Sequence, residues 1–114
     1  FIAGGTGITP FLAIFRALYY SGNLKKTGLI YSNRTQEDII LHDELFKMLG
    51  PAYMNVFTRE GVIGFKERRI DKKFLIENIS YFGGIFYVCG TLDFTREITK
   101  DLISLGARTD SVVI

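Results

Sequence analysis

The sequence predicts an α/β domain, a five-stranded parallel sheet with helices on both faces. Short segments rich in Ile, Val, Phe and Tyr alternate along the chain with segments whose apolar residues recur at helical spacing. Residues 84–90 (GIFYVCG) are apolar almost throughout, which is typical of a strand covered on both faces. Because strands alternate with helices, consecutive strands are expected to run in parallel, with the helices packed over the sheet.

Each expected element begins or ends at a residue that suits the boundary. Pro10 fits the first turn of a helix, where its missing N–H would have no partner, and Thr9 before it can cap that helix. Gly50 and Pro51 end the second helix, and Asp71 caps a short third one. The expected strands are 1–3, 27–32, 53–58, 84–90 and 111–114, and the longer expected helices are 10–21, 40–49 and 93–105.

Composition excludes several classes of protein. A chain of 114 residues, 47% apolar and 23% charged, forms one domain with a sizeable core. The net charge of +2 is small and the basic residues are scattered, unlike the concentrated stripe of a nucleic-acid-binding module. A single cysteine fits a reducing compartment, and no apolar run reaches the roughly 18 residues of a membrane span. We therefore expect a cytoplasmic domain with no nucleic-acid partner and no membrane span.

Residues 4–10 (GGTGITP) follow the first strand and precede a helix. The glycines allow a tight turn and a close approach by a ligand, and the positive end of the helix favours an anion. The segment matches neither G-x-G-x-x-G nor G-x-x-x-x-G-K-[ST], since no glycine lies three residues after Gly7 and no Lys follows Pro10. Two interpretations stay open on spacing alone: a turn that only packs, and a phosphate-binding loop.

Four motifs occur in a specific order: GGTGITP, YSNRTQEDIILHDEL, FTRE, and FYVCG followed by an acidic–aromatic pair. Together they resemble the pyridine-nucleotide-binding domain of the ferredoxin-NADP reductase superfamily, over essentially the whole chain. The resemblance implies a Rossmann-like fold and a module that delivers hydride from NAD(P)H to FAD or FMN. Electrons would then pass to ferredoxin, flavodoxin or an oxygenase component.

In that superfamily a flavin-binding barrel domain precedes the nucleotide-binding domain. Only residues 1–3 stand before the first turn, whereas strands usually run about five to six residues. Residues 1–114 are therefore expected to be one NAD(P)H-binding domain, with a flavin-binding domain upstream in the parent protein. The isolated chain would then be part of an oxidoreductase, inactive without its flavin domain. The alternative is a non-catalytic nucleotide-binding or regulatory domain of the same fold.

The resemblance also assigns roles to residues at the strand ends, where ligands bind in open parallel sheets. The glycine loop would lie under the pyrophosphate, the next two strand ends would hold the adenosine half, and the fourth would line the nicotinamide. These residues are Gly5, Thr6, Gly7, Ile8, Thr9 and Pro10 for the pyrophosphate, Ser32, Asn33, Arg34, Thr58 and Arg59 for the adenosine half, and Cys89, Gly90, Thr91 and Asp93 for the nicotinamide end.

Two of these assignments carry more detail. The resemblance implies that Cys89 lies near the nicotinamide and positions it, and no histidine in a neighbouring motif would activate it as a nucleophile. Thr91 departs from the superfamily, which often has Pro after Cys-Gly, but Thr91 can cap the helix that follows.

The nucleotide preference depends on charge at the adenosine end. Residues 58–60 (TRE) resemble the Ser-Arg-Glu of NADP-using members, and residues 32–34 (SNR) contain no carboxylate. Arg68 or Arg69 follows at a suitable distance. Guanidinium groups make bidentate contacts to phosphate, so NADP is favoured over NAD. The alternative is that the arginines at positions 34 and 59 are solvated and paired with nearby glutamates.

No metal site is expected. His42 is the single histidine, and it lies far from the single cysteine, so no ligand cluster forms. Asp43 and Glu44 are adjacent on a predicted helix and face different directions, so they make no acid–base pair.

Overall fold

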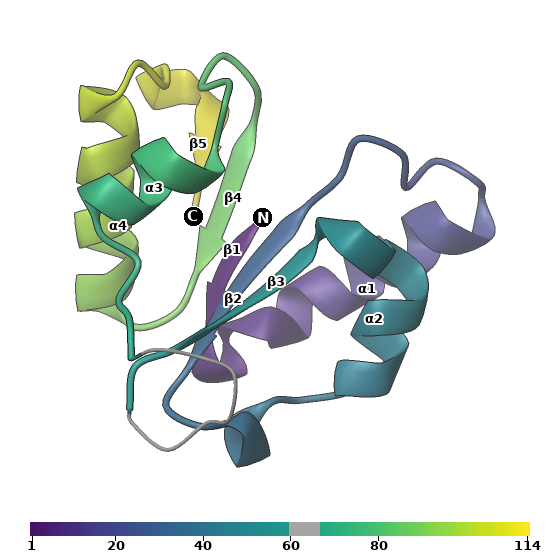
Figure 1. The fold of residues 1–114 in the computed structure, drawn as a ribbon. Coiled ribbons are helices and arrows are strands. Elements are labelled where there is room, and N and C mark those ends of the chain that lie inside the picture. Colours follow the sequence, from purple (N-terminus) through teal and green to yellow (C-terminus); the bar gives the residue numbers. More distant parts are fainter. Residues whose placement is uncertain (60–66) are drawn as a thin grey trace.

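The computed structural model describes residues 1–59 and 67–114, so Glu60 of the FTRE motif lies outside the described residues. The five strands form one parallel sheet in the order β3-β2-β1-β4-β5 (Figure 1). The predicted fold class is confirmed. The strands are β1 (Ile2–Gly4), β2 (Leu29–Asn33), β3 (Tyr53–Phe57), β4 (Phe86–Cys89) and β5 (Val112–Val113).

Two pairs of helices cover the two faces of the sheet (Figure 1). One core cluster contains residues of α1, α2, β1 and β2, and the other joins residues of α3, α4, β1 and β4. Successive strand residues point to opposite faces, so Ile2 packs in the second cluster and Ala3 in the first. The helices are α1 (Thr9–Tyr20), α2 (His42–Leu49), α3 (Lys72–Asn78) and α4 (Leu92–Ser104), with 3₁₀ turns η1 (Gly5–Ile8), η2 (Gln36–Asp38), η3 (Gly50–Ala52) and η4 (Thr109–Ser111).

The register brings four strand ends to one edge of the sheet. Gly4 pairs with Ser32, Asn33 with Phe57, and Ala3 with Cys89, so the carboxyl ends of β1 to β4 are neighbours. β1 lies between β2 and β4, and the strand order reverses there. Ligands bind at this kind of switch point in open α/β sheets.

The three longer helices begin one or two residues from the expected positions, at Thr9, His42 and Leu92. The helix expected from residue 40 begins at His42, because Leu41 takes a left-handed conformation with φ 52°. Thr9 was expected to cap α1, and this is wrong: Thr9 is the first residue of α1, and its N–H donates to the Thr6 carbonyl of the preceding 3₁₀ turn. The cap expected at Asp71 is confirmed, since its carboxylate accepts the Phe74 N–H at 2.8 Å.

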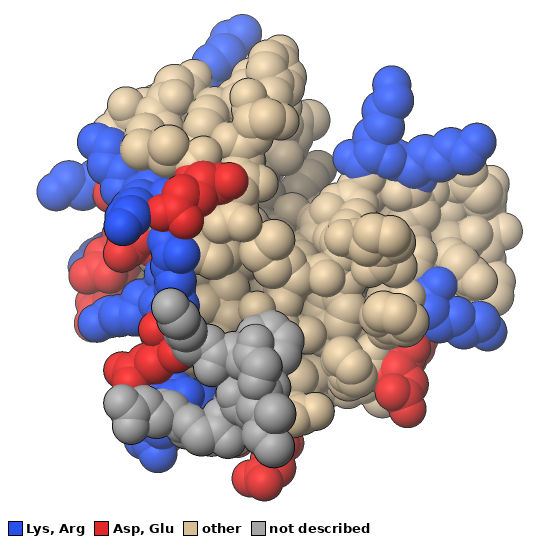
Figure 2. All heavy atoms as spheres, in the orientation of Figure 1, with Lys and Arg blue, Asp and Glu red and all other residues tan. Residues whose placement is uncertain are grey.

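Charged side chains of both signs mix over α3 and α4, on the left of Figure 2. Charged residues of both signs also border a second, smaller depression near these helices: Arg69, Asp71, Glu97, Lys100 and Asp101. No single-sign stripe is seen on this face. Within the described part of the chain, no helix is long and apolar enough to cross a membrane.

Candidate functional site

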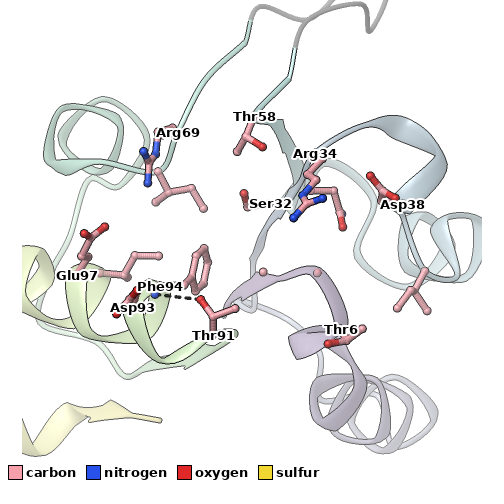
Figure 3. Close-up of a pocket in the computed structure, with 16 residues that line it drawn as sticks. Thr6, Ser32, Arg34, Asp38, Thr58, Arg69, Thr91, Asp93, Phe94 and Glu97 are labelled. Carbon is pink, nitrogen blue, oxygen red and sulfur yellow. Dashed lines mark hydrogen bonds between the residues drawn. The ribbon is translucent and has the colours of Figure 1, made fainter.

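A cavity of about 770 Å³ lies at the carboxyl ends of the strands. Figure 3 shows it between the glycine loop, the ends of β2 and β3, and the first turns of α4. The sequence-predicted site residues that line it are Gly5, Thr6, Ser32, Asn33, Arg34, Thr58, Thr91 and Asp93. The predicted residues that do not line it are Gly7, Ile8, Thr9, Pro10, Arg59, Cys89 and Gly90.

The glycine loop is a 3₁₀ turn that runs directly into α1. Gly5 has φ +55°, a conformation that side chains rarely adopt. A Cβ on Gly7 would lie 2.4 Å from the Cys89 carbonyl oxygen, so the loop packs against the end of β4 and Gly7 is required there. The Ile8 side chain is fully buried in the core, so only its main chain could contact a ligand. Thr9 and Pro10 are exposed on the first turn of α1.

A buried tyrosine holds this loop from behind. The Tyr31 hydroxyl donates to the Gly5 carbonyl oxygen at 2.8 Å, and the Tyr31 ring is fully buried among the residues of α1 and α2. Burial raises the pKa of the Tyr31 phenol, so the hydroxyl keeps its proton. Sequence reasoning missed this residue, because its position in a strand indicates only a core side chain.

The ends of β2 and β3 form the far wall. Ser32 and Asn33 are buried, and the Asn33 Nδ2 atom has no acceptor in hydrogen-bond geometry among the described residues. The Thr58 N–H donates to the Asn33 carbonyl at 2.9 Å, which continues the pairing of the two strands and places Thr58 at the cavity. The Arg59 side chain is exposed and lies outside the lining.

Charged groups stand on two sides of the cavity in Figure 3, with Arg34 and Asp38 on one side and Arg69 and Glu97 on the other. The Asp38 carboxylate accepts the Thr35 N–H at 3.1 Å and the Thr35 hydroxyl at 3.0 Å, as part of a capping box. The Asp38 carboxylate therefore has fewer lone pairs left to accept hydrogen bonds from a ligand. Asp38 and Glu97 were not among the predicted site residues, because they come from a loop and a helix turn rather than a strand end.

Of the two adjacent arginines considered from the sequence, Arg69 lines the cavity. Arg68 instead makes a two-bond pair with Glu77, at 3.1 and 3.2 Å, and its guanidinium lies 5.0 Å from the centre of the Phe74 ring. The Arg68 guanidinium is bound to Glu77 of α3. Of these two arginines, Arg69 is therefore the one available to a ligand in the cavity.

The start of α4 closes the cavity on the side of β4. Thr91 Oγ1 accepts the Phe94 N–H at 3.2 Å, which confirms the expected cap (Figure 3). The Phe94 ring lines the cavity and packs against two glycines: a Cβ on Gly90 would lie 2.6 Å from the ring, and one on Gly4 3.1 Å. Cys89 is half-buried behind the glycine loop.

This arrangement, a glycine loop at the switch point of a parallel sheet, agrees with the comparisons with known proteins. The sequence pattern of the family described as "Oxidoreductase NAD-binding domain" matches residues 1–100. The chain belongs to this family. The resemblance to the nucleotide-binding domain of the ferredoxin-NADP reductase superfamily is thereby confirmed.

Curated relatives include two fungal enzymes. The chain is 31% identical to NADH-cytochrome b5 reductase 1 of Meyerozyma guilliermondii over 116 residues, which is 92% of this chain and 40% of the relative. It is 50% identical to NADH-cytochrome b5 reductase 1 of Debaryomyces hansenii over 48 residues, covering 41% of this chain and 17% of the relative. The chain thus spans less than half the length of these relatives.

Solved structures show the same fold. The cytochrome b5 reductase domain of Ulva prolifera nitrate reductase matches with a TM-score of 0.77 at 24% identity, over 98% of this chain and 46% of that one. The FAD/NAD-binding domain of nitric oxide dioxygenase from Vibrio cholerae gives 0.79 at 23% identity, over 97% and 47%. The CS-b5R domains of human Ncb5or, solved in an NAD+ form, give 0.76 at 26% identity, over 97% and 34%.

Proposed function

We propose that this domain binds NAD(P)H across the carboxyl ends of its strands and presents it to a flavin held by another domain of the parent protein. The cavity at the switch point is the observation that carries the proposal, because it joins a glycine loop, two polar strand ends and the β4–α4 turn. The nicotinamide and the flavin supply the hydride chemistry. The residues of this chain bind and orient the nucleotide.

The pyrophosphate is assigned to the Gly5–Ile8 turn. The first N–H groups of a helical turn have no partner within the helix, and the helix dipole adds positive charge at that end. The first turn of η1 and α1 contains no acidic residue, whereas α4 has Asp93 in its first turn. The start of the Gly5–Ile8 turn is therefore better suited to bind an anion than the start of α4.

The nicotinamide is assigned to the turn after β4. Gly90 and Thr91 lie beside the Phe94 ring, and Gly7 holds the glycine loop against the Cys89 carbonyl. This packing fixes the β4 end relative to the pyrophosphate loop. Cys89 is a positioning residue in this proposal, as the resemblance implies.

The adenosine half is assigned to the wall formed by Ser32, Asn33 and Thr58. We propose NADPH as the preferred donor, because Arg34 beside this wall and Arg69 on the other side both line the cavity, and a guanidinium group suits a 2′-phosphate. The NADH in the names of the fungal relatives supports the opposite preference. The proposed preference for NADPH therefore depends on the two arginines that line the cavity, Arg34 and Arg69.

For the parent protein we propose a flavin-dependent NAD(P)H oxidoreductase that passes electrons to a carrier protein. Ferredoxin, flavodoxin and an oxygenase component are the acceptors that the superfamily implies, and the names of the relatives add a haem protein of the cytochrome b5 kind. A non-catalytic nucleotide-binding domain would bind the same ligands without transfer. Stopped-flow mixing of the parent protein with NADPH separates the two, since only the reductase bleaches the flavin absorbance.

Calorimetric titration of the chain with NADPH and NADH tests the binding. Arg34→Ala is expected to weaken NADPH about tenfold through loss of a charged contact, and to change NADH little. Arg59→Ala is the matched control, since Arg59 is exposed at the same sheet edge but outside the lining. Equal effects of Arg34→Ala on both nucleotides would refute the NADPH preference. No binding of either nucleotide to the wild type would refute the proposed function.

A further inference from the structure

The Tyr31 hydroxyl is the one side-chain group that the structure bonds to the Gly5 carbonyl among the described residues. Tyr31 is not itself one of the residues that line the cavity, yet its hydroxyl bonds to Gly5 in the loop that forms one wall. We propose that Tyr31 is a positioning residue for the nucleotide pyrophosphate, fixing the Gly5–Thr6 peptide so that the Thr6 N–H faces the bound anion. This inference rests on the proposed function.

The direction of the Thr6 N–H follows from the planarity of the Gly5–Thr6 peptide bond. In a trans peptide the C=O and the following N–H point in opposite directions. The Gly5 carbonyl points inward to Tyr31, so the Thr6 N–H points away from the core. Thr6 is exposed and is among the residues that line the cavity. The hydrogen bond therefore aims one main-chain donor at the cavity.

The conformation of Gly5 explains why the Gly5–Thr6 peptide needs a restraint. Glycine at φ +55° has little steric resistance to rotating the next peptide, so the loop needs another restraint to keep one orientation. If the peptide turned over, the Gly5 carbonyl oxygen would face the cavity and repel a phosphate. The buried hydroxyl opposes this rotation, because turning the peptide over would break its hydrogen bond to the Gly5 carbonyl.

The surroundings of Tyr31 make it a firm anchor. Its ring is fully buried between residues of α1 and α2, and its strand is paired on both sides, with β1 and with β3. The hydroxyl therefore cannot follow the loop if the loop moves. The bond spans two elements far apart in the sequence, and so ties the loop after β1 to the middle of β2.

Tyr31→Phe removes the hydroxyl and keeps the ring in the core. We expect it to weaken binding of ADP-ribose, which contains the pyrophosphate, by about three- to tenfold, the range for one net hydrogen bond. Binding of AMP, which lacks the pyrophosphate bridge, should change by less than about twofold. Tyr53→Phe is the matched control, since Tyr53 lies on β3 and its hydroxyl pairs with His42 Nδ1 instead of the loop.

Calorimetric titration of the 114-residue chain with the two ligands gives the readout. A loss specific to ADP-ribose in Tyr31→Phe supports the inference, because a general loss of structure would weaken both ligands. An unchanged affinity for ADP-ribose, or equal losses for both ligands, would overturn it. Absence of ADP-ribose binding by the wild type would refute the proposed function itself, which is a separate result.

A measurement on the wild type needs no variant. In proton–nitrogen NMR spectra, the Thr6 amide proton should move downfield when ADP-ribose is added and should stay within about 0.1 ppm of its free position with AMP, as expected for a charge-assisted hydrogen bond to the pyrophosphate. A Thr6 amide that does not respond to saturating ADP-ribose would overturn the inference even if Tyr31→Phe failed to fold.

Discussion

The two strand-to-helix connections at the switch point differ in how their helices begin. β1 and β4 are neighbours, and each leads through a glycine-containing turn into a helix. α4 begins with a side-chain cap from Thr91 and carries Asp93 in its first turn. The Gly5–Ile8 turn and α1 begin with no side-chain cap and no acidic residue in the first turn.

This difference shows which helix start is free for a ligand. At α4 a hydroxyl of the chain itself already accepts one of the first N–H groups, and Asp93 adds negative charge there. At the start of η1 there is neither a side-chain cap nor an acidic residue, so an external anion can accept from the first N–H groups there. Two neighbouring turns of similar composition thus have different roles, and three substitutions test the difference.

Gly7→Ala should have the largest effect, and it acts on the fold. The added Cβ would meet the Cys89 carbonyl oxygen at 2.4 Å, and because that oxygen belongs to the backbone at the end of β4, it cannot move away cheaply. We expect a loss of about 3 kcal/mol in the free energy of unfolding, measured by urea denaturation. Gly28→Ala is the control, since its nearest contact would be an ordinary 3.5 Å. Equal stabilities of the two variants would contradict this packing.

Thr6→Asp should have the next largest effect, and it acts on binding. A carboxylate at the uncapped turn would repel the pyrophosphate and weaken NADPH about tenfold at low salt, less at high salt. Stability should stay the same or rise, because an acidic residue suits the start of a helix. Thr6→Asn supplies a neutral side chain of similar size. If Thr6→Asp bound NADPH as tightly as Thr6→Asn, the anion would not sit at this turn.

Thr91→Ala should have the smallest effect on the site. Loss of the cap at α4 is expected to lower the free energy of unfolding by about 1 kcal/mol, and to leave nucleotide affinity within about twofold. Thr91→Ser keeps the hydroxyl and should restore the stability, as measured by thermal denaturation. A large loss of affinity in Thr91→Ala with normal stability would contradict a purely capping role and show that the Thr91 hydroxyl contacts the nucleotide.

The fold was predictable because its signals are local. Buried strands such as Phe86–Cys89 and the caps at Asp71 and Thr91 depend on neighbours within a few residues. The start of α2 was not predictable, since a leucine at positive φ is rare and only the surrounding structure holds Leu41 there. The 3₁₀ turn before α1, which makes Thr9 a helical residue, was not predictable either. It depends on how the glycine loop packs against β4.

The candidate site was predictable where strand ends supply it. Ser32, Asn33 and Thr58 line the cavity because parallel strands end together at one edge. Asp38 and Glu97 were missed, since their approach to the cavity is decided by tertiary packing. Arg59 was placed in the site by its motif; its side chain is exposed in the bend after β3 and outside the lining of this cavity, so that assignment stays a prediction.

The strand order has a consequence for the order of folding events. β1, β2 and β3 can pair with their sequence neighbours, but the cavity also needs β4, whose Val88 must find Ile2 across most of the chain. Contacts between residues so far apart in sequence form slowly. A nucleotide bound across the ends of β1 and β4 would stabilise only the folded state in which these two strands are paired. Nucleotide binding therefore requires β1 to β4 to be paired. Added nucleotide should raise the melting temperature of the domain.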